Sequence, residues 1–166
     1  MYKRQAQRFA KLLQQLENDP TVGEFHIVAH SMGGVVARQA LLDHRPTKLK
    51  RFLMLATPNK GSAVARKLSQ SIFRFSKTLG QISDVEGSYV RQLERLVGVE
   101  MGAIHAQVDR VVTRESCFAE PGIPSVELYS GHNDLLIRPA TARATFQFLT
   151  TGRFTCLLYT SPSPRD

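Results

Sequence analysis

The sequence predicts an α/β domain built on a parallel, doubly wound sheet. Short apolar runs of strand length alternate along the chain with segments in which apolar residues recur every three or four positions. Such alternation is typical of parallel sheets, because two parallel strands need a long crossover, usually a helix, to connect them. With 166 residues, the chain is long enough to form one domain with a substantial core.

Four apolar runs flanked by turn residues are predicted to be strands: 25–30, 51–57, 101–108 and 125–129. Three segments with helical spacing are predicted to be helices: 6–17, 33–42 and 139–149. In the first helix the apolar positions are Phe9, Leu12, Leu13 and Leu16. The last helix carries Pro139 in its first turn, where a missing N–H costs nothing.

A segment at 62–97, between the second and third strands, has helical spacing in two pieces. Two interpretations are open for it. It is either a helical cap whose apolar faces cover a substrate pocket, or a pair of helices packed on the sheet. No repeat or low-complexity linker occurs between residues 6 and 155, so one domain is expected over this range.

The formal net charge is +8, but lysines and arginines are scattered singly with little aromatic interleaving. We therefore expect a charged, solvated surface and no nucleic-acid partner. The apolar runs are far too short to cross a bilayer. The two cysteines, Cys117 and Cys156, cannot form a disulfide framework.

The two ends of the sequence, 1–5 and 156–166, are expected to be foreign to the natural protein. Residues 2–5 can be encoded by TAT-AAG-AGA-CAG, whose reverse complement also fits the codons of residues 156–159 once a preceding C is added. Ends that can be encoded as an inverted repeat are typical of a translated sequencing adapter. The natural segment is therefore expected to be about 6–155, interrupted at both ends.

The most informative motif is the corner after the first strand, Ala29-His30-Ser31-Met32-Gly33. A strand that enters a helix through a tight turn with small flanking residues exposes a serine hydroxyl above the carboxyl edge of the sheet. The usual pattern is G-x-S-x-G, and alanine here replaces the first glycine. The pattern predicts that Ser31 is a nucleophile and that the backbone N–H of Met32 stabilises an oxyanion.

A serine nucleophile needs a base, and the five histidines differ in where the predicted elements place them. His26 and His105 lie inside strands, and His44 follows a helix at the opposite edge. His30 is adjacent to the serine but is expected to point to the wrong side of its strand. Only His132 follows a strand, after a Ser-Gly turn, so it is the predicted general base.

The acid that orients this base should follow a strand between the serine and the histidine. Asp109 comes directly after the run 101–108 and is the predicted acid. Asp84 and Glu86 lie in the helical insertion. Asp134 is the alternative, although it sits two residues after His132 and would need a later histidine, which the chain does not have. The resulting order is serine, acid, histidine.

On these residues the sequence resembles the α/β-hydrolase superfamily, specifically its lipase- and esterase-like members. The corner resembles their HSMGG segment, and 55–62 resembles their T-P-H-x-G-S turn, with Asn59 in place of the histidine. The segments 109–112 and 132–136 resemble those that carry the catalytic acid and histidine. The likeness extends over most of residues 6–155.

The resemblance implies a serine hydrolase of carboxylic esters, acting through an acyl-enzyme on a small-molecule or lipid ester without metal or cofactor. Association with a lipid surface is left open. Alternatives are an acyltransferase with the same triad and a hydrolase-fold binding protein without turnover. The resemblance also implies an H-G loop and further strands upstream of Ala6. The sheet is therefore expected to be incomplete at its N-terminus, and the fragment alone to be poorly stable and weakly active.

Overall fold

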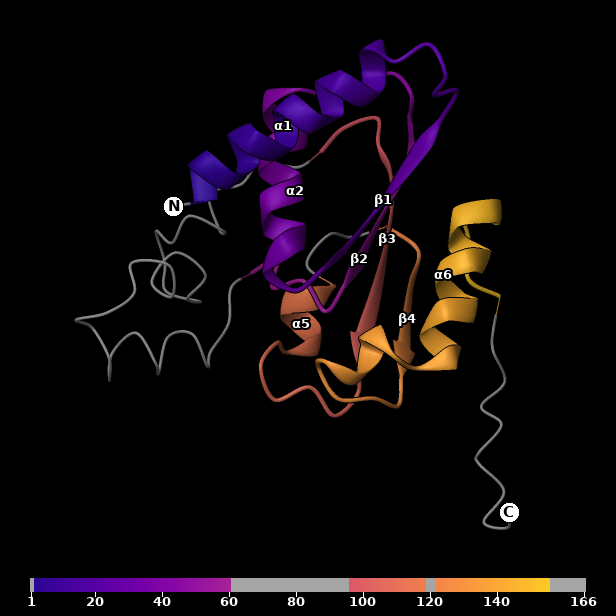
Figure 1. The fold of residues 1–166 in the computed structure, drawn as a ribbon. Helices are drawn as coiled ribbons and strands as arrows, with labels where there is room; N and C mark the ends of the chain where they lie inside the picture. The colour runs from indigo at the N-terminus through magenta and orange to yellow at the C-terminus, as the bar shows by residue number, and fades with distance from the viewer. Residues whose placement is uncertain (1, 61–95, 119–121, 156–166) are drawn as a thin grey trace, which may run out of the picture.

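The computed structural model describes residues 2–60, 96–118 and 122–155 (Figure 1). The predicted helical insertion at 62–97 lies outside the described residues, apart from residues 96 and 97, so its interpretation as a cap or as packed helices stays open. Residues 156–166, predicted to be foreign, also lie outside them.

Four strands form one parallel sheet, and their order in space, β1-β2-β3-β4, is their order in the chain. The strands are β1 (Phe25–His30), β2 (Leu49–Leu55), β3 (Glu100–Ala106) and β4 (Ser125–Leu128). All four were predicted, with ends that differ by up to two residues. Strand β2 ends at Leu55 because Ala56 adopts a positive φ of 44°, and β3 ends at Ala106 because its carbonyl accepts a turn bond from the Asp109 amide.

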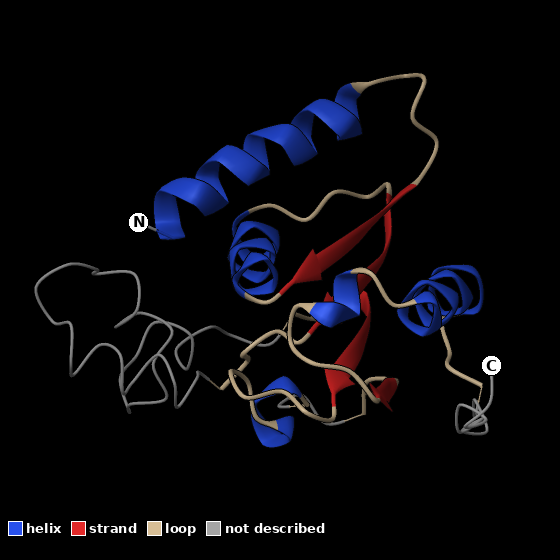
Figure 2. Ribbon diagram, turned by 60° about the horizontal axis from the view of Figure 1, so that its bottom comes forward, coloured by secondary structure: helices blue, strands red, loops and turns tan. Residues whose placement is uncertain are grey.

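Helices cover both faces of the sheet, which confirms the predicted doubly wound architecture (Figures 1 and 2). The three long helices, all predicted, are α1 (Tyr2–Asn18), α2 (Met32–Asp43) and α6 (Pro139–Thr151). Two short elements were not predicted: the helix α5 (Arg114–Cys117) and the 3₁₀ helix η2 (Asp134–Leu136). Helices α1, α2 and α5 lie on one side of the sheet and α6 on the other.

Helix α1 packs on α2 through a face centred on Leu13, which is 1% exposed. Ala6 is buried beside it, and Phe9 and Ala10 pack against the same core, so the buried positions follow helical spacing. Leu12 was expected on this face, but it is 46% exposed. The prediction was wrong because two alanines, rather than Leu12, complete the apolar stripe.

Helix α6 contacts the opposite face of the sheet where β3 has no side chain. A Cβ added to Gly102 would lie 2.6 Å from the ring of Phe148, which is fully buried. The ring therefore occupies the space above the glycine and brings α6 close to the sheet. The adjoining core consists of apolar residues from β2 and the position after it, β3, η2 and α6: Leu53, Leu55, Ala56, Ile104, Ala106, Leu135, Ala144 and Phe148.

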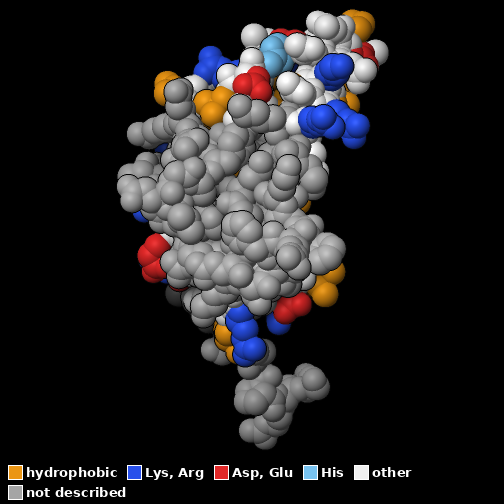
Figure 3. All heavy atoms as spheres, turned by 90° about the vertical axis from the view of Figure 1, so that its left-hand side faces the viewer, with side chains coloured by type: hydrophobic (Ala, Val, Ile, Leu, Met, Phe, Trp, Pro, Cys, Tyr) orange, Lys and Arg blue, Asp and Glu red, His pale blue; other side chains and the backbone are white. Residues whose placement is uncertain are grey.

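Among the described residues, no helix combines the length and hydrophobicity that a membrane span requires. In the view of Figure 3, the visible lysine and arginine side chains of these residues lie among acidic and apolar ones.

The contact between Gly102 and Phe148 can be tested by overpacking it. We expect Gly102→Ala to lower the free energy of unfolding by about 1–3 kcal/mol, because a buried ring cannot move away from a new methyl group without displacing α6. Urea denaturation measures this change. The control is Gly23→Ala, where an added Cβ meets nothing within 4 Å. The double variant Gly102→Ala/Phe148→Leu should lose less free energy of unfolding than the two single variants lose together. Additive losses would contradict the prediction.

Candidate active site

Ser31 lies at the corner between β1 and α2, in a backbone conformation that non-glycine residues rarely adopt. Its φ and ψ are 51° and −125°. A strained residue of this kind costs on the order of 1–3 kcal/mol and persists only where its surroundings hold it. Here the Ser31 amide donates to the Leu55 carbonyl at 2.8 Å, and the Ser31 carbonyl accepts from the Gly34 amide at 3.1 Å. The corner thus anchors the serine to the end of β2.

Small residues let the helix approach the strands at this corner. A Cβ on Gly34 would lie only 2.0 Å from the hydroxyl oxygen of Thr57, so α2 and the end of β2 are in direct contact there. By contrast, a Cβ on Gly33 would meet the Ala29 methyl at 3.9 Å, an ordinary contact distance. The alanine that replaces the usual first glycine is therefore accommodated, and Gly34 is the position with the least space.

The structure brings Ser31, His132 and Asp109 into one hydrogen-bonded chain at the carboxyl edge of the sheet. Nδ1 of His132 lies 2.7 Å from Oδ2 of Asp109, and Nε2 lies 2.9 Å from Oγ of Ser31. Because an ionised carboxylate only accepts, Nδ1 carries the proton, and in the neutral ring Nε2 accepts from the serine hydroxyl. The three residues come from loops after β1, β3 and β4.

The two oxygens of Asp109 have separate partners. Oδ2 faces the His132 ring, whereas Oδ1 accepts from the amides of Val111 and Val112 at 2.8 and 2.9 Å. The Asp109 side chain is 0% exposed. Burial would raise the pKa of this carboxyl, but the hydrogen bonds from the His132 ring and the two amides outweigh it and hold the pKa below its usual value near 3.8. The carboxylate is therefore ionised at neutral pH.

Asp134, the alternative acid, occupies a different position. It is exposed at the start of η2, and its carboxylate faces Gly131. Both nitrogens of the His132 ring are already engaged, by Asp109 and Ser31. The geometry therefore favours Asp109 as the partner of the histidine.

Two histidines that were not predicted to belong to the site, His105 and His30, contact its loops. His105 is 4% exposed; its Nδ1 lies 3.1 Å from Glu127 on β4, and its Nε2 lies 3.2 Å from the carbonyl of Val112, in the loop that holds Asp109. His30 contacts the carbonyl of His132 at 2.9 Å. The contact of His105 could have been found only from the register of β3 and β4, which pairs His105 with Glu127. That register cannot be read from the periodicity of the sequence alone.

The turn after β2 is fixed from both sides by Asn59, which is 5% exposed. Its Oδ1 accepts from Nη1 of Arg38 on α2 at 3.0 Å, and its Nδ2 donates to the carbonyl of Cys117 on α5 at 2.9 Å. The Lys60 amide donates to Oγ of Ser116 at 3.1 Å. Asparagine at this position therefore bridges α2 and α5. Burial raises the pKa of the Cys117 thiol to about 12, which leaves it a poor nucleophile.

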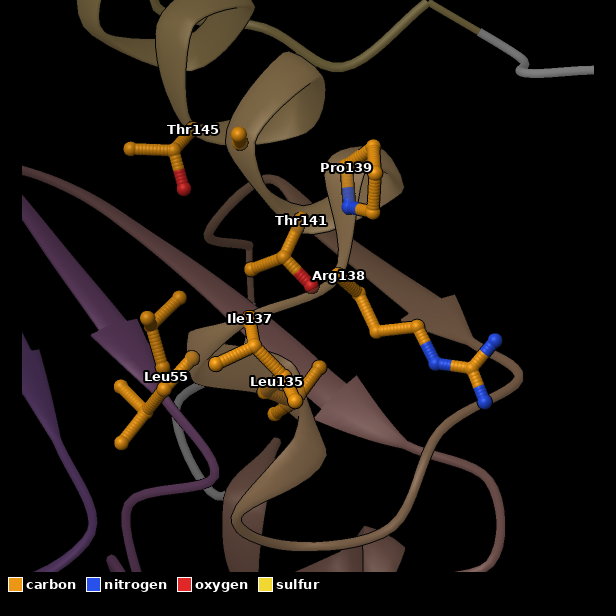
Figure 4. Close-up of a pocket in the computed structure, with 9 residues that line it drawn as sticks. Leu55, Leu135, Ile137, Arg138, Pro139, Thr141 and Thr145 are labelled. Carbon is orange, nitrogen blue, oxygen red and sulfur yellow. The ribbon is translucent and has the colours of Figure 1, made fainter.

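An open pocket of about 210 Å³ lies between the end of β2, η2 and the start of α6 (Figure 4). Its lining is mainly apolar: Leu55, Leu135, Leu136, Ile137, Arg138, Pro139, Thr141, Ala142 and Thr145. The side chain of Arg138 extends away from the cluster of Leu55, Leu135 and Ile137. The pocket therefore suits an apolar group better than a charged one.

The parallel sheet covered on both faces, with a strained serine corner between its first described strand and the following helix, defines an α/β-hydrolase domain. The chain belongs to the family of the PGAP1-like alpha/beta domain, whose family model matches residues 3–132. A comparison with curated protein sequences gives no match.

Solved structures of hydrolases share this fold. A mature lipase of Bacillus licheniformis superposes with a TM-score of 0.63 and 16% identity, over 92% of this chain and 75% of the lipase. A hydrolase of Pseudomonas aeruginosa gives 0.57 and 18%, over 90% and 72%. A carboxylesterase of the thaumarchaeon Nitrososphaera gargenis gives 0.55 and 16%, over 89% and 72%. The resemblance to α/β-hydrolases expected from the motifs is thus confirmed.

The lowered pKa of Asp109 predicts a pH dependence of stability. A carboxyl whose pKa is lower in the folded than in the unfolded state stabilises the fold above the unfolded value, near 3.8, and this contribution is lost as the pH falls through the folded value. We therefore expect the difference in free energy of unfolding between the wild type and Asp109→Asn to become smaller as the pH is lowered from 6 to 3. Urea titrations across this range measure it, with Asp134→Asn as the exposed control. Parallel curves for the wild type and Asp109→Asn would contradict the prediction.

Proposed function

We propose that the protein is a serine hydrolase of carboxylic esters in which Ser31 is the nucleophile, His132 the general base and Asp109 the acid that orients it. The observation that carries the proposal is the hydrogen-bonded chain from the Asp109 carboxylate through both nitrogens of His132 to the Ser31 hydroxyl. A serine hydroxyl is a weak nucleophile unless a base removes its proton, and a base works best when a third group fixes its tautomer.

The first half of the reaction forms an acyl-enzyme. Nε2 of His132 takes the proton of Ser31 as Oγ bonds to the ester carbonyl carbon. The same nitrogen then gives that proton to the departing alcohol oxygen as the ester C–O bond breaks. Asp109 stabilises the imidazolium between these steps, because its ionised carboxylate is held at Nδ1. In the second half, His132 activates water, which releases the acid and restores the serine.

The oxyanion of the tetrahedral intermediate would be stabilised at the start of α2. Met32 is the first residue of this helix and directly follows the nucleophile, so its amide lies at the positive end of the helix dipole. A backbone donor placed there is worth on the order of a hundred- to a thousandfold in rate.

The proposed substrate class is an ester with an apolar portion. It is supported by the apolar lining of the pocket between β2, η2 and α6 and by the fold shared with a lipase and a carboxylesterase. The chain order of serine, acid and histidine is also that of esterases with this fold.

Covalent labelling tests the nucleophile. We expect a fluorophosphonate to add one label to the wild type on the peptide that contains Ser31, because only an activated serine reacts with this reagent at an appreciable rate. Intact-mass analysis and peptide mapping measure it. Ser31→Ala should stay unlabelled. The control Ser125→Ala removes an exposed serine at the amino end of β4, the end away from His132, and should label at the wild-type rate. Absence of label on Ser31 would favour a binding protein without turnover.

Matched substitutions test the acid. We expect Asp109→Asn to lower kcat for a short-chain aryl ester by roughly 10⁴-fold, because the amide would favour the wrong tautomer of His132. Asp134→Asn should stay within about twofold of the wild type, since its carboxylate faces Gly131 rather than the ring. Steady-state kinetics at neutral pH measure both variants. The reverse result would assign the acid to Asp134.

A further inference from the structure

The ring of His30 lies against the loop that carries His132. His30 is the last residue of β1, and its Nε2 lies 2.9 Å from the backbone carbonyl of His132. The two rings have centroids 4.8 Å apart and are tilted by 50°. The contact joins residues 102 positions apart in the sequence, next to the nucleophile on one side and at the proposed base on the other.

The chemistry of this contact defines the form of the His30 ring. A carbonyl oxygen can only accept, so Nε2 of His30 must carry the hydrogen. The neutral ring with its proton on Nε2 meets this requirement. Burial lowers the pKa of His30 and His132 lowers it further, whereas the bond to the carbonyl and the Asp109 carboxylate act in the opposite direction. The net effect is a lowered pKa, which favours the neutral donor.

We infer that His30 is a positioning residue, which anchors the backbone of His132 so that the ring of His132 stays aligned between Asp109 and Ser31. The inference rests on the proposed function for its catalytic consequence, but the anchoring itself is a matter of geometry. His30 acts through the backbone and does not exchange a proton with the substrate.

The anchor is effective because the other contacts of this loop restrain different atoms. The Val108 amide donates to the Ser130 carbonyl at 3.1 Å. This bond connects the start of the loop that carries His132 to the loop that carries Asp109. Asp109 restrains the His132 ring at Nδ1. Gly131 lies between these points, directly before His132. The bond from His30 fixes the backbone of His132, from which the ring projects.

The neutral state of His30 has a second consequence. During the proposed reaction His132 becomes an imidazolium, and a neutral ring 4.8 Å away does not repel that charge. A permanent cation at this position would raise the energy of the imidazolium by direct repulsion. The site therefore suits a donor that carries no charge at neutral pH.

Three variants separate the donor from the ring. Relative to the wild type, we expect His30→Phe, which keeps a ring but removes the donor, to lower kcat about 10- to 100-fold with KM within about twofold, because a small displacement of a catalytic group has effects of this size. His30→Gln keeps an N–H donor and should stay within about fivefold of the wild-type kcat. The control is His26→Phe, which alters the same face of β1 away from the site. Thermal unfolding of each variant identifies losses that arise from unfolding.

A spectroscopic readout keeps the inference independent of turnover. The Nδ1 proton of His132, held by Asp109, should give a low-field ¹H NMR signal that His30→Phe broadens or shifts and His30→Gln retains. If the wild type lacks esterase activity but the signal responds in this way, the proposed function fails and the anchoring stands. Equal effects of His30→Phe and His30→Gln, or unchanged kcat and an unchanged signal in His30→Phe, would overturn the inference.

Discussion

The candidate site depends on the parallel pairing of β1 to β4. Because all four strands run in one direction, their carboxyl ends meet at one edge of the sheet, where loops bring together side chains that are remote in sequence. Pairing alone would leave the loops free to move. The backbone bonds from Ser31 to Leu55 and from Val108 to Ser130 connect neighbouring strand ends and set the spacing within which His132 reaches both of its partners.

Close backbone packing and polar anchoring act together around this edge. Gly34 lets α2 contact Thr57, which brings the strained serine corner against the end of β2. Asn59 then fixes the following turn to α2 and α5. Asp109 is held in the same way, with one oxygen on two backbone amides and the other on the histidine. Ser31 and Asp109 are therefore each restrained by backbone contacts as well as by the hydrogen bond to His132.

The strands and long helices could be predicted because their apolar periods are local and strong. The corner at Ser31 and the choice of His132 and Asp109 followed from requiring all three at one sheet edge, and the structure brings them within hydrogen-bond distance, although their catalytic roles stay predictions. Leu12 was placed wrongly because alanines count little in an apolar pattern. The contact of His30 could not be predicted, since it depends on how the loop after β4 folds back over β1.

The separation of Ser31 and His132 by 101 residues has a consequence for biosynthesis. The ribosome completes the serine corner early, but the imidazole and the strand that precedes it emerge much later. Under the proposed function, the Ser31 hydroxyl of a nascent chain therefore lacks its base until β4 has docked against β3. The proposed reactivity toward esters would then appear only in molecules that have finished assembling the sheet, so a covalent titrant of the serine would count properly folded chains.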